Sequence, residues 1–113
     1  MPGPWRTHVD ADAWAPMELG GDIVGEVHTL RSDEGARAYE AGLWRVLGEL
    51  PAPFDYDFEL DETIHVLEGG VVIAVDGGPT LALGPGDVAS FAAGSRATWR
   101  IVRTPFKELF VLS

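Results

Sequence analysis

Residues 55–66 read Asp-Tyr-Asp-Phe-Glu-Leu-Asp-Glu-Thr-Ile-His-Val, and over most of this stretch acidic residues alternate with aromatic or aliphatic ones. Successive side chains of a β-strand point to opposite faces, so this period of two predicts a strand with one apolar and one solvent-facing side. Glu62 breaks the pattern because it occupies an apolar-face position, followed there by Ile64 and Val66. An unpaired carboxylate among apolar side chains is costly or takes up a proton. Glu62 is therefore the first candidate for a functional residue.

Similar short runs rich in Val, Ile, Leu, Phe and Trp recur after residue 21, separated by Gly, Pro and Asp at intervals of about ten residues. This spacing predicts an all-β fold, a small antiparallel barrel or jelly roll. Residues 33–41 contain Gly35 and are too short for a stable helix, so we expect a loop or a single turn there. The expected strands are 22–29, 42–48, 54–60, 62–67, 71–75, 79–83, 87–91, 97–102 and 106–112.

The length of 113 residues predicts a single domain. We expect residues 21–113 to form the barrel and residues 1–20 to form an irregular N-terminal arm. Trp5 and Trp14 in this arm are expected to pack on the chain's own barrel or on a second subunit. Because exposed strand edges favour association, we expect a homodimer in which the arm or an edge strand covers the partner.

Composition narrows the classes of partner. The formal net charge of −10 argues against nucleic acid and against an anionic membrane surface. Cysteine is absent, which excludes disulfides and thiolate sites, and the N-terminal residues lack the pattern of a signal peptide, so we expect a cytoplasmic protein. A cluster of basic residues is expected to face the acidic stretch 55–61, or alternatively an anionic ligand: Arg96, Arg100, Arg103 and Lys107.

Two segments resemble the signature motifs of the cupin superfamily. The first is Glu62-Thr-Ile-His-Val-Leu-Glu-Gly69, and the second runs from Gly84 through Gly86 and Gly94 to Trp99, with Ala92 in place of a proline. Residues 42–44 and 106–111 also look like the small single-domain branch related to ureidoglycine aminohydrolase and to the ethanolamine-utilisation cupin. The resemblance covers roughly residues 42–112 and implies a double-stranded β-helix barrel.

The resemblance departs from the family pattern at the metal positions. Metal-binding cupins carry two histidines upstream of the glutamate and another in the second motif, where this chain has Tyr56, Phe58 and Ala97. A lone carboxylate is a poor transition-metal site, since such metals are usually held by imidazole and carboxylate together. We therefore expect no metal or other cofactor, with Mn, Fe, Ni or Zn kept open as alternatives. The three histidines lie elsewhere: His8, His28 and His65.

Strand parity and the inward positions of the family predict which residues surround Glu62. They form a mostly apolar pocket with few polar groups, as is usual for small ligands. Glu62 itself has two interpretations: a structural carboxylate bonded to a tyrosine or arginine, or a functional one that orients a ligand or acts as a general acid/base. The candidate ligand-binding residues are Trp44, Arg45, Tyr56, Phe58, Glu62, Arg96 and Trp99.

Three functions follow from this pocket. The first is binding of a small polar organic molecule without a metal. The second is enzymatic, metal-dependent or acid/base chemistry on a nitrogenous metabolite, as the likeness to ureidoglycine aminohydrolase implies, with Glu62 as the candidate catalytic residue. The third is a dimeric accessory module with a vestigial pocket, in which Glu62→Leu would be tolerated.

Overall fold

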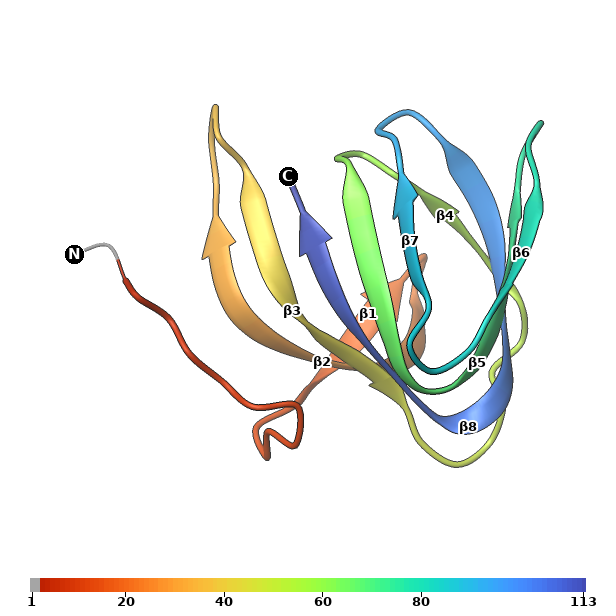
Figure 1. Cartoon of the computed structure of the whole chain (residues 1–113), viewed down its shortest axis with the longest axis horizontal. Coiled ribbons are helices and arrows are strands. Elements are labelled where there is room, and N and C mark those ends of the chain that lie inside the picture. The colour runs from red at the N-terminus through yellow and green to blue at the C-terminus, as the bar shows by residue number, and fades with distance from the viewer. Residues whose placement is uncertain (1–2) are drawn as a thin grey trace.

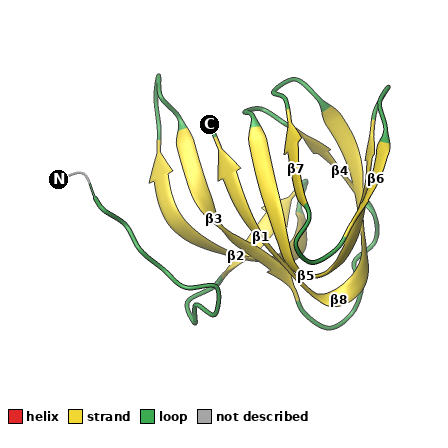
Figure 2. Ribbon diagram, viewed as in Figure 1, coloured by secondary structure: helices red, strands yellow, loops and turns green. Residues whose placement is uncertain are grey.

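The computed structural model describes residues 3–113, and in this range the chain consists of β-strands and loops (Figure 2). The strands curve around a common interior, with one sheet ordered β1-β2-β3-β8-β5-β6 (Figure 1). β4 pairs with β8 and β7 pairs with β5, and every pairing is antiparallel. The strand bounds are β1 (Ala15–Leu19), β2 (Asp22–Asp33), β3 (Tyr39–Val46), β4 (Phe54–Asp57), β5 (Glu62–Val75), β6 (Thr80–Leu83), β7 (Val88–Phe91) and β8 (Arg96–Leu112).

The two longest strands, β5 and β8, pair with each other along most of their length. Each has different neighbours at its two ends. Residues 96–99 of β8 pair with β4, whereas residues 106–112 pair with β3. Residues 62–65 of β5 pair with β7, whereas residues 71–74 pair with β6. The two bent strands therefore belong to both sides of the barrel, which explains how one short chain encloses an interior.

The bend in β5 lies at Gly69, where the β5–β8 register shifts repeatedly. Gly69 has a φ of +77°, and a Cβ there would lie 2.5 Å from the carbonyl oxygen of Arg103. Only glycine combines this backbone conformation with such a close approach. Residues 62–67 and 71–75, expected as two separate strands, are thus one strand with a bulge at Gly69-Gly70. Residues 97–102 and 106–112 likewise join into the single strand β8.

Apolar side chains form a continuous core inside the barrel. The rings of Phe58 and Phe91 stack with their centroids 4.6 Å apart. Ile73 and Phe106 are completely buried. Burial of this kind supplies the main favourable term in folding. The other large, fully buried side chains here are Ile64, Val66, Val71 and Ile101.

The N-terminal arm is only partly irregular. Residues 15–19 form β1, which pairs with β2 through a turn at Gly20-Gly21. The preceding residues contact their own barrel: the imidazole Nδ1 of His28 donates to the carbonyl of Ala13, and Lys107 donates to the carbonyl of Val9. The expected arm also included residues 1 and 2, which lie outside the described residues.

Two further sequence expectations were inexact at their edges. β2 extends to Asp33 and β3 begins at Tyr39, so the expected loop is confined to residues 34–38. Of the four basic residues expected to face the acidic stretch, Arg96 does so, with ion pairs to Asp55 and Asp57, whereas Lys107 pairs with Asp10 and Glu68. Residues 3–113 include no helix of the length and apolar character that a membrane span requires.

Candidate functional site

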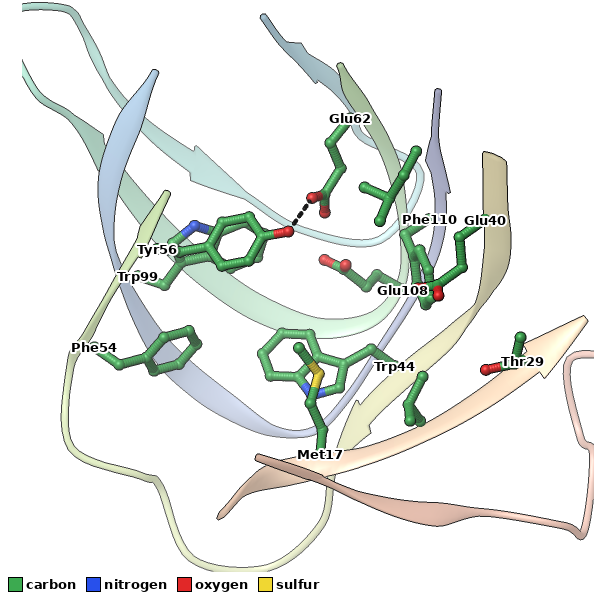
Figure 3. Close-up of a pocket in the computed structure, with 12 residues that line it drawn as sticks. Met17, Thr29, Glu40, Trp44, Phe54, Tyr56, Glu62, Trp99, Glu108 and Phe110 are labelled. Carbon is green, nitrogen blue, oxygen red and sulfur yellow. Dashed lines mark hydrogen bonds between the residues drawn. The ribbon is translucent and has the colours of Figure 1, made fainter. Parts of the chain in front are cut away.

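A pocket of about 210 Å³ lies beside the apolar core, and Trp44, Trp99 and Phe110 belong to both. Figure 3 shows side chains from several strands converging on it, with Glu62 and Glu108 near its centre and Trp44, Phe54 and Trp99 around it. Both bent strands contribute, since β5 supplies Glu62 and β8 supplies residues from both of its ends. The pocket is lined by Met17, Val27, Thr29, Glu40, Trp44, Phe54, Tyr56, Glu62, Trp99, Glu108, Phe110 and Leu112.

Glu62 is the first residue of β5 and is 5% exposed. The hydroxyl of Tyr56 donates a 2.8 Å hydrogen bond to its Oε1 (Figure 3). Burial raises the pKa of Glu62 to about 7, the bond from Tyr56 acts against this rise, and the nearby charge of Glu40 adds to it. The carboxyl group is thus close to half-protonated at neutral pH. Burial beside Glu62 also raises the pKa of the Tyr56 hydroxyl, which stays a donor.

Glu108 is a second buried carboxyl group and is 2% exposed. It lies on β8 opposite Trp44 of β3 and points into the pocket (Figure 3). Its Oε1 has no hydrogen-bond partner among the described residues. Burial, together with the charge of Glu62, raises the pKa of Glu108 well above its usual range. The same pocket thus holds two carboxyl groups whose ionisation is opposed by burial.

Aromatic rings form the wall of the pocket. Trp44 meets Trp99 edge-to-face at 5.9 Å and Phe54 at 6.0 Å, and Phe54 stacks on Trp99 at 6.3 Å. The indole Nε1 of Trp44 donates to the carbonyl of Val24, which fixes the ring. The indole Nε1 of Trp99 has no acceptor among the described residues. The rings form a rigid apolar wall, because aromatic pairs of this geometry restrain each other.

Four of the predicted ligand-binding residues line the pocket together, and three do not. Phe58 is buried behind Tyr56, packed between it and Phe91. Arg45 points outward, bonds Glu26 and covers the ring of Trp14. Arg96 also lies outside, among aspartates. The outward pair follows strand parity, since Arg45 adjoins the inward Trp44 and Arg96 adjoins the inward Ala97. The residues brought together are Trp44, Tyr56, Glu62 and Trp99.

Glu108 is the most important residue that the sequence analysis missed. Its signal was present, because Glu108 shares strand parity with Phe106 and Phe110, just as Glu62 does with Ile64. The Gly20-Gly21 pair, a typical hairpin turn, similarly marks β1, which brings Met17 to the pocket. The other lining residues that were missed are Val27, Thr29, Glu40, Phe54, Phe110 and Leu112.

The residues present do not fit the metal centre of metal-binding cupins. Tyr56 and Ala97 face each other across β4 and β8, so the upstream and downstream histidine positions hold a phenol and a methyl group. None of the lining residues is a histidine. Within residues 3–113, no three His, Cys, Asp or Glu side chains are grouped so as to hold a metal ion. His28, for example, bonds the N-terminal segment instead.

The sequence profile of the EutQ-like cupin domain matches residues 36–109. The chain belongs to the EutQ-like cupin family. This match includes β5, β7 and most of β8, and hence both buried glutamates. None of the curated protein sequences matches the chain.

Solved structures share the cupin fold. The EutQ protein of Clostridium difficile superposes with a TM-score of 0.65 at 19% identity, over 86% of this chain and 74% of that one. A DUF861 family protein of Thermotoga maritima gives a TM-score of 0.55 at 25% identity, over 63% of this chain and 76% of that one. Fe(II)-HppE, solved with an alternative substrate, gives a TM-score of 0.68 at 13% identity, over 95% of this chain and 58% of that one. The fold therefore occurs both in EutQ proteins and in an iron-containing protein.

Proposed function

We propose that this EutQ-like cupin binds a small polar organic molecule in the barrel pocket, with Glu62 as its polar anchor and without a metal. The observation that carries the proposal is the burial of two carboxyl groups, Glu62 and Glu108, in an aromatic pocket that has room for a ligand. Within residues 3–113, the hydroxyl of Tyr56 is the one group that donates to this pair. The pair thus retains free acceptor capacity inside the pocket.

This arrangement is costly for a purely structural site. A buried polar group without a partner costs about 1–3 kcal/mol, and a barrel could fill the same positions with aliphatic side chains at no such cost. The aromatic wall and the few convergent polar groups match the usual composition of small-molecule sites. These features support binding over a pocket that has lost its role.

The test is a ligand screen by one- and two-dimensional NMR on the wild-type protein, Glu62→Gln and Glu59→Gln. Glu59 is exposed on the solvent side and serves as a control for the loss of one negative charge. A molecule that binds in the pocket should lose affinity by about tenfold or more in Glu62→Gln, since a bond to a charged group contributes about 1.5–3 kcal/mol. It should bind Glu59→Gln normally. Unchanged affinity in Glu62→Gln would contradict the proposal.

The metal-free part of the proposal has its own measurement. Elemental analysis of untagged protein, purified without chelators, should give Mn, Fe, Ni and Zn far below one equivalent in both the wild type and Glu62→Gln. Near-stoichiometric metal in the wild type that disappears in the variant would replace this proposal with a metal site built on unusual ligands.

A second candidate function is acid/base chemistry on a nitrogenous metabolite, and the pKa of about 7 at Glu62 favours it. A general acid or base works best when its pKa is near the operating pH. The wild-type protein would then release ammonia from some member of a panel of ureido and amino compounds, with a rate that Glu62→Gln reduces by at least about a hundredfold. Binding without turnover across such a panel would contradict this catalytic function and leave binding as the proposed function.

A further inference from the structure

We propose that the pocket takes a small organic cation with N–H donors, of the protonated primary amine class, held between the carboxyl groups of Glu62 and Glu108. The inference rests on the proposed function and names the class of its ligand.

The lining carries acidic side chains and no basic one. Glu40, Glu62 and Glu108 come from three different strands, while Arg45, which directly follows the lining residue Trp44, points outward to Glu26. An anionic ligand would therefore meet like charges at short range without a neutralising group. A cation would meet two buried carboxyl groups and would favour the ionised form of each.

The unpartnered atoms distinguish an amine from other cations. Oε1 of Glu108 is buried without a donor, and Glu62 accepts a single bond from Tyr56. A primary ammonium group carries three donors and can serve both carboxyl groups at once. A quaternary ammonium ion has no N–H group, so it would leave Oε1 of Glu108 unsatisfied.

The rings supply the second part of the recognition. Trp44, Phe54, Tyr56 and Trp99 surround the carboxyl groups (Figure 3). Faces of aromatic rings attract cations, most strongly when the site is desolvated, and they also receive an alkyl chain. The volume of about 210 Å³ equals that of about seven water molecules in the liquid, which suits a molecule of about five to ten non-hydrogen atoms.

The proposal has a pH dependence that can be traced to named groups. Glu62 is faced by Tyr56 from β4, Glu40 from β3 and Glu108 from β8, whereas its β7 neighbour is the non-titrating Phe91. With a pKa of about 7, Glu62 is mostly protonated below neutrality and mostly ionised above it. An alkylamine stays protonated throughout this range, as lysine does. Affinity for the cation should therefore rise as the pH increases through about 7.

The experiment uses four probes of similar size: n-butylammonium, tetramethylammonium, 1-butanol and butanoate. Each is titrated into the full chain at about pH 8, where Glu62 is ionised. Binding is followed by the indole N–H signals in ¹H–¹⁵N spectra. The indoles of Trp44 and Trp99 line the pocket, whereas those of Trp5 and Trp14 lie outside it and serve as internal controls.

We expect n-butylammonium to shift the signals of Trp44 and Trp99 and to bind about tenfold or more tightly than 1-butanol and tetramethylammonium. We expect its affinity to fall at about pH 6, because Glu62 is then protonated. Equal or tighter binding of 1-butanol or butanoate would overturn the cation class and leave the proposed function standing. Tetramethylammonium binding as tightly as n-butylammonium would overturn the requirement for N–H donors.

Variants provide a second line of evidence. Glu108→Gln should weaken n-butylammonium by about tenfold or more, while the exposed-site control Glu59→Gln should leave its affinity unchanged. Equal affinity in Glu108→Gln and the wild type would overturn the proposal. The wild-type probe series needs neither variant, so the proposal stays testable if Glu108→Gln folds poorly. A probe series in which n-butylammonium shifts no pocket signal also overturns it, and the broader ligand screen then decides the proposed function separately.

Discussion

The carboxyl groups inside the barrel and those on its outer face have opposite electrostatic environments. On the outer face, Asp55, Asp57 and Asp76 surround Arg96, which pairs with the first at 3.0 Å. Inside, Glu62 and Glu108 share a pocket whose lining has no basic side chain. The outer group lies on the same strands as the inner residues. Asp55 directly precedes Tyr56 on β4, and Arg96 directly precedes Ala97 on β8. A small change of position therefore separates two very different electrostatic environments.

The pKa directions follow from this difference. Hydrogen bonds from Thr98 and Arg96 lower the pKa of Asp55, whereas burial raises those of Glu62 and Glu108. Outside, the chain supplies the cation that a carboxylate needs. Inside, the pocket lining provides no such cation, and this lowers the stability of the fold. The proposed ligand would supply the missing positive charge.

The largest expected effect is on the pH dependence of stability. Because the pKa of Glu62 is raised from 4.5 to about 7 in the folded state, its contribution to stability is fully present below pH 4.5 and is lost as the pH rises through about 7. The loss is about 3 kcal/mol, which urea unfolding across this range should detect. In Glu62→Gln this part of the pH dependence should disappear. A wild-type profile that is flat or rises over this range would contradict the contrast between the two groups.

Replacing the second inner carboxyl group should also stabilise the fold. Glu108→Met keeps a similar side-chain volume and removes a buried group without a donor, so we expect a gain of about 1–3 kcal/mol in the free energy of unfolding at about pH 8. Chemical denaturation of the variant measures this gain. The control Glu59→Met, at an exposed site, should leave stability nearly unchanged. Destabilisation by Glu108→Met would mean that Glu108 has a stabilising partner.

Tyr56→Phe sharpens the comparison by removing the one donor to the inner pair. The bond from Tyr56 holds down the pKa of Glu62, so the variant should raise that pKa above about 7. It should also cost about 1 kcal/mol of stability where Glu62 is ionised. A ¹³C titration of the Glu62 carboxyl carbon measures the pKa directly. A lower pKa in the variant would show that water or another donor stabilises the ionised carboxylate of Glu62 more strongly than the hydroxyl of Tyr56 does.

The smallest effect is expected on the outer face. Arg96→Gln leaves three aspartates without their cation, but all of these groups are solvent-exposed and strongly screened. The melting temperature should fall slightly at low salt, and molar salt should remove most of the difference. A large decrease that persists at molar salt would mean that Arg96 holds β4 against β8 by more than charge.

The fold could be predicted from sequence because its signals are local. The alternation over residues 55–66 and the turn residues between apolar runs define strands, and the Glu62 and Gly69 motif supplied the cupin resemblance, which the family match confirms. The continuity of β5 and β8 could not be predicted in the same way. Gly69-Gly70 and Pro105 look like interruptions locally, and only the pairing between the two long strands carries the chain through them.

The candidate site was predicted in part. Parity correctly placed Glu62, Tyr56, Trp44 and Trp99 inside. Arg45 and Arg96 face outward instead, because each adjoins an inward-facing residue on its strand. The remaining lining residues come from β1, β2, β3, β4 and the second half of β8, and their meeting depends on long-range strand order that periodicity does not encode.

β8 contributes side chains to the pocket near both of its ends. Figure 1 shows the strand running as a single arc, and the pocket is lined both by Trp99, near the start of the strand, and by Glu108, near its end. The separation of these two side chains across the pocket therefore depends on the curvature of this one strand. A ligand that touches both residues would tie the ends of this arc together. Ligand binding would then reduce the backbone mobility of the middle of β8, at a distance from the atoms that the ligand contacts.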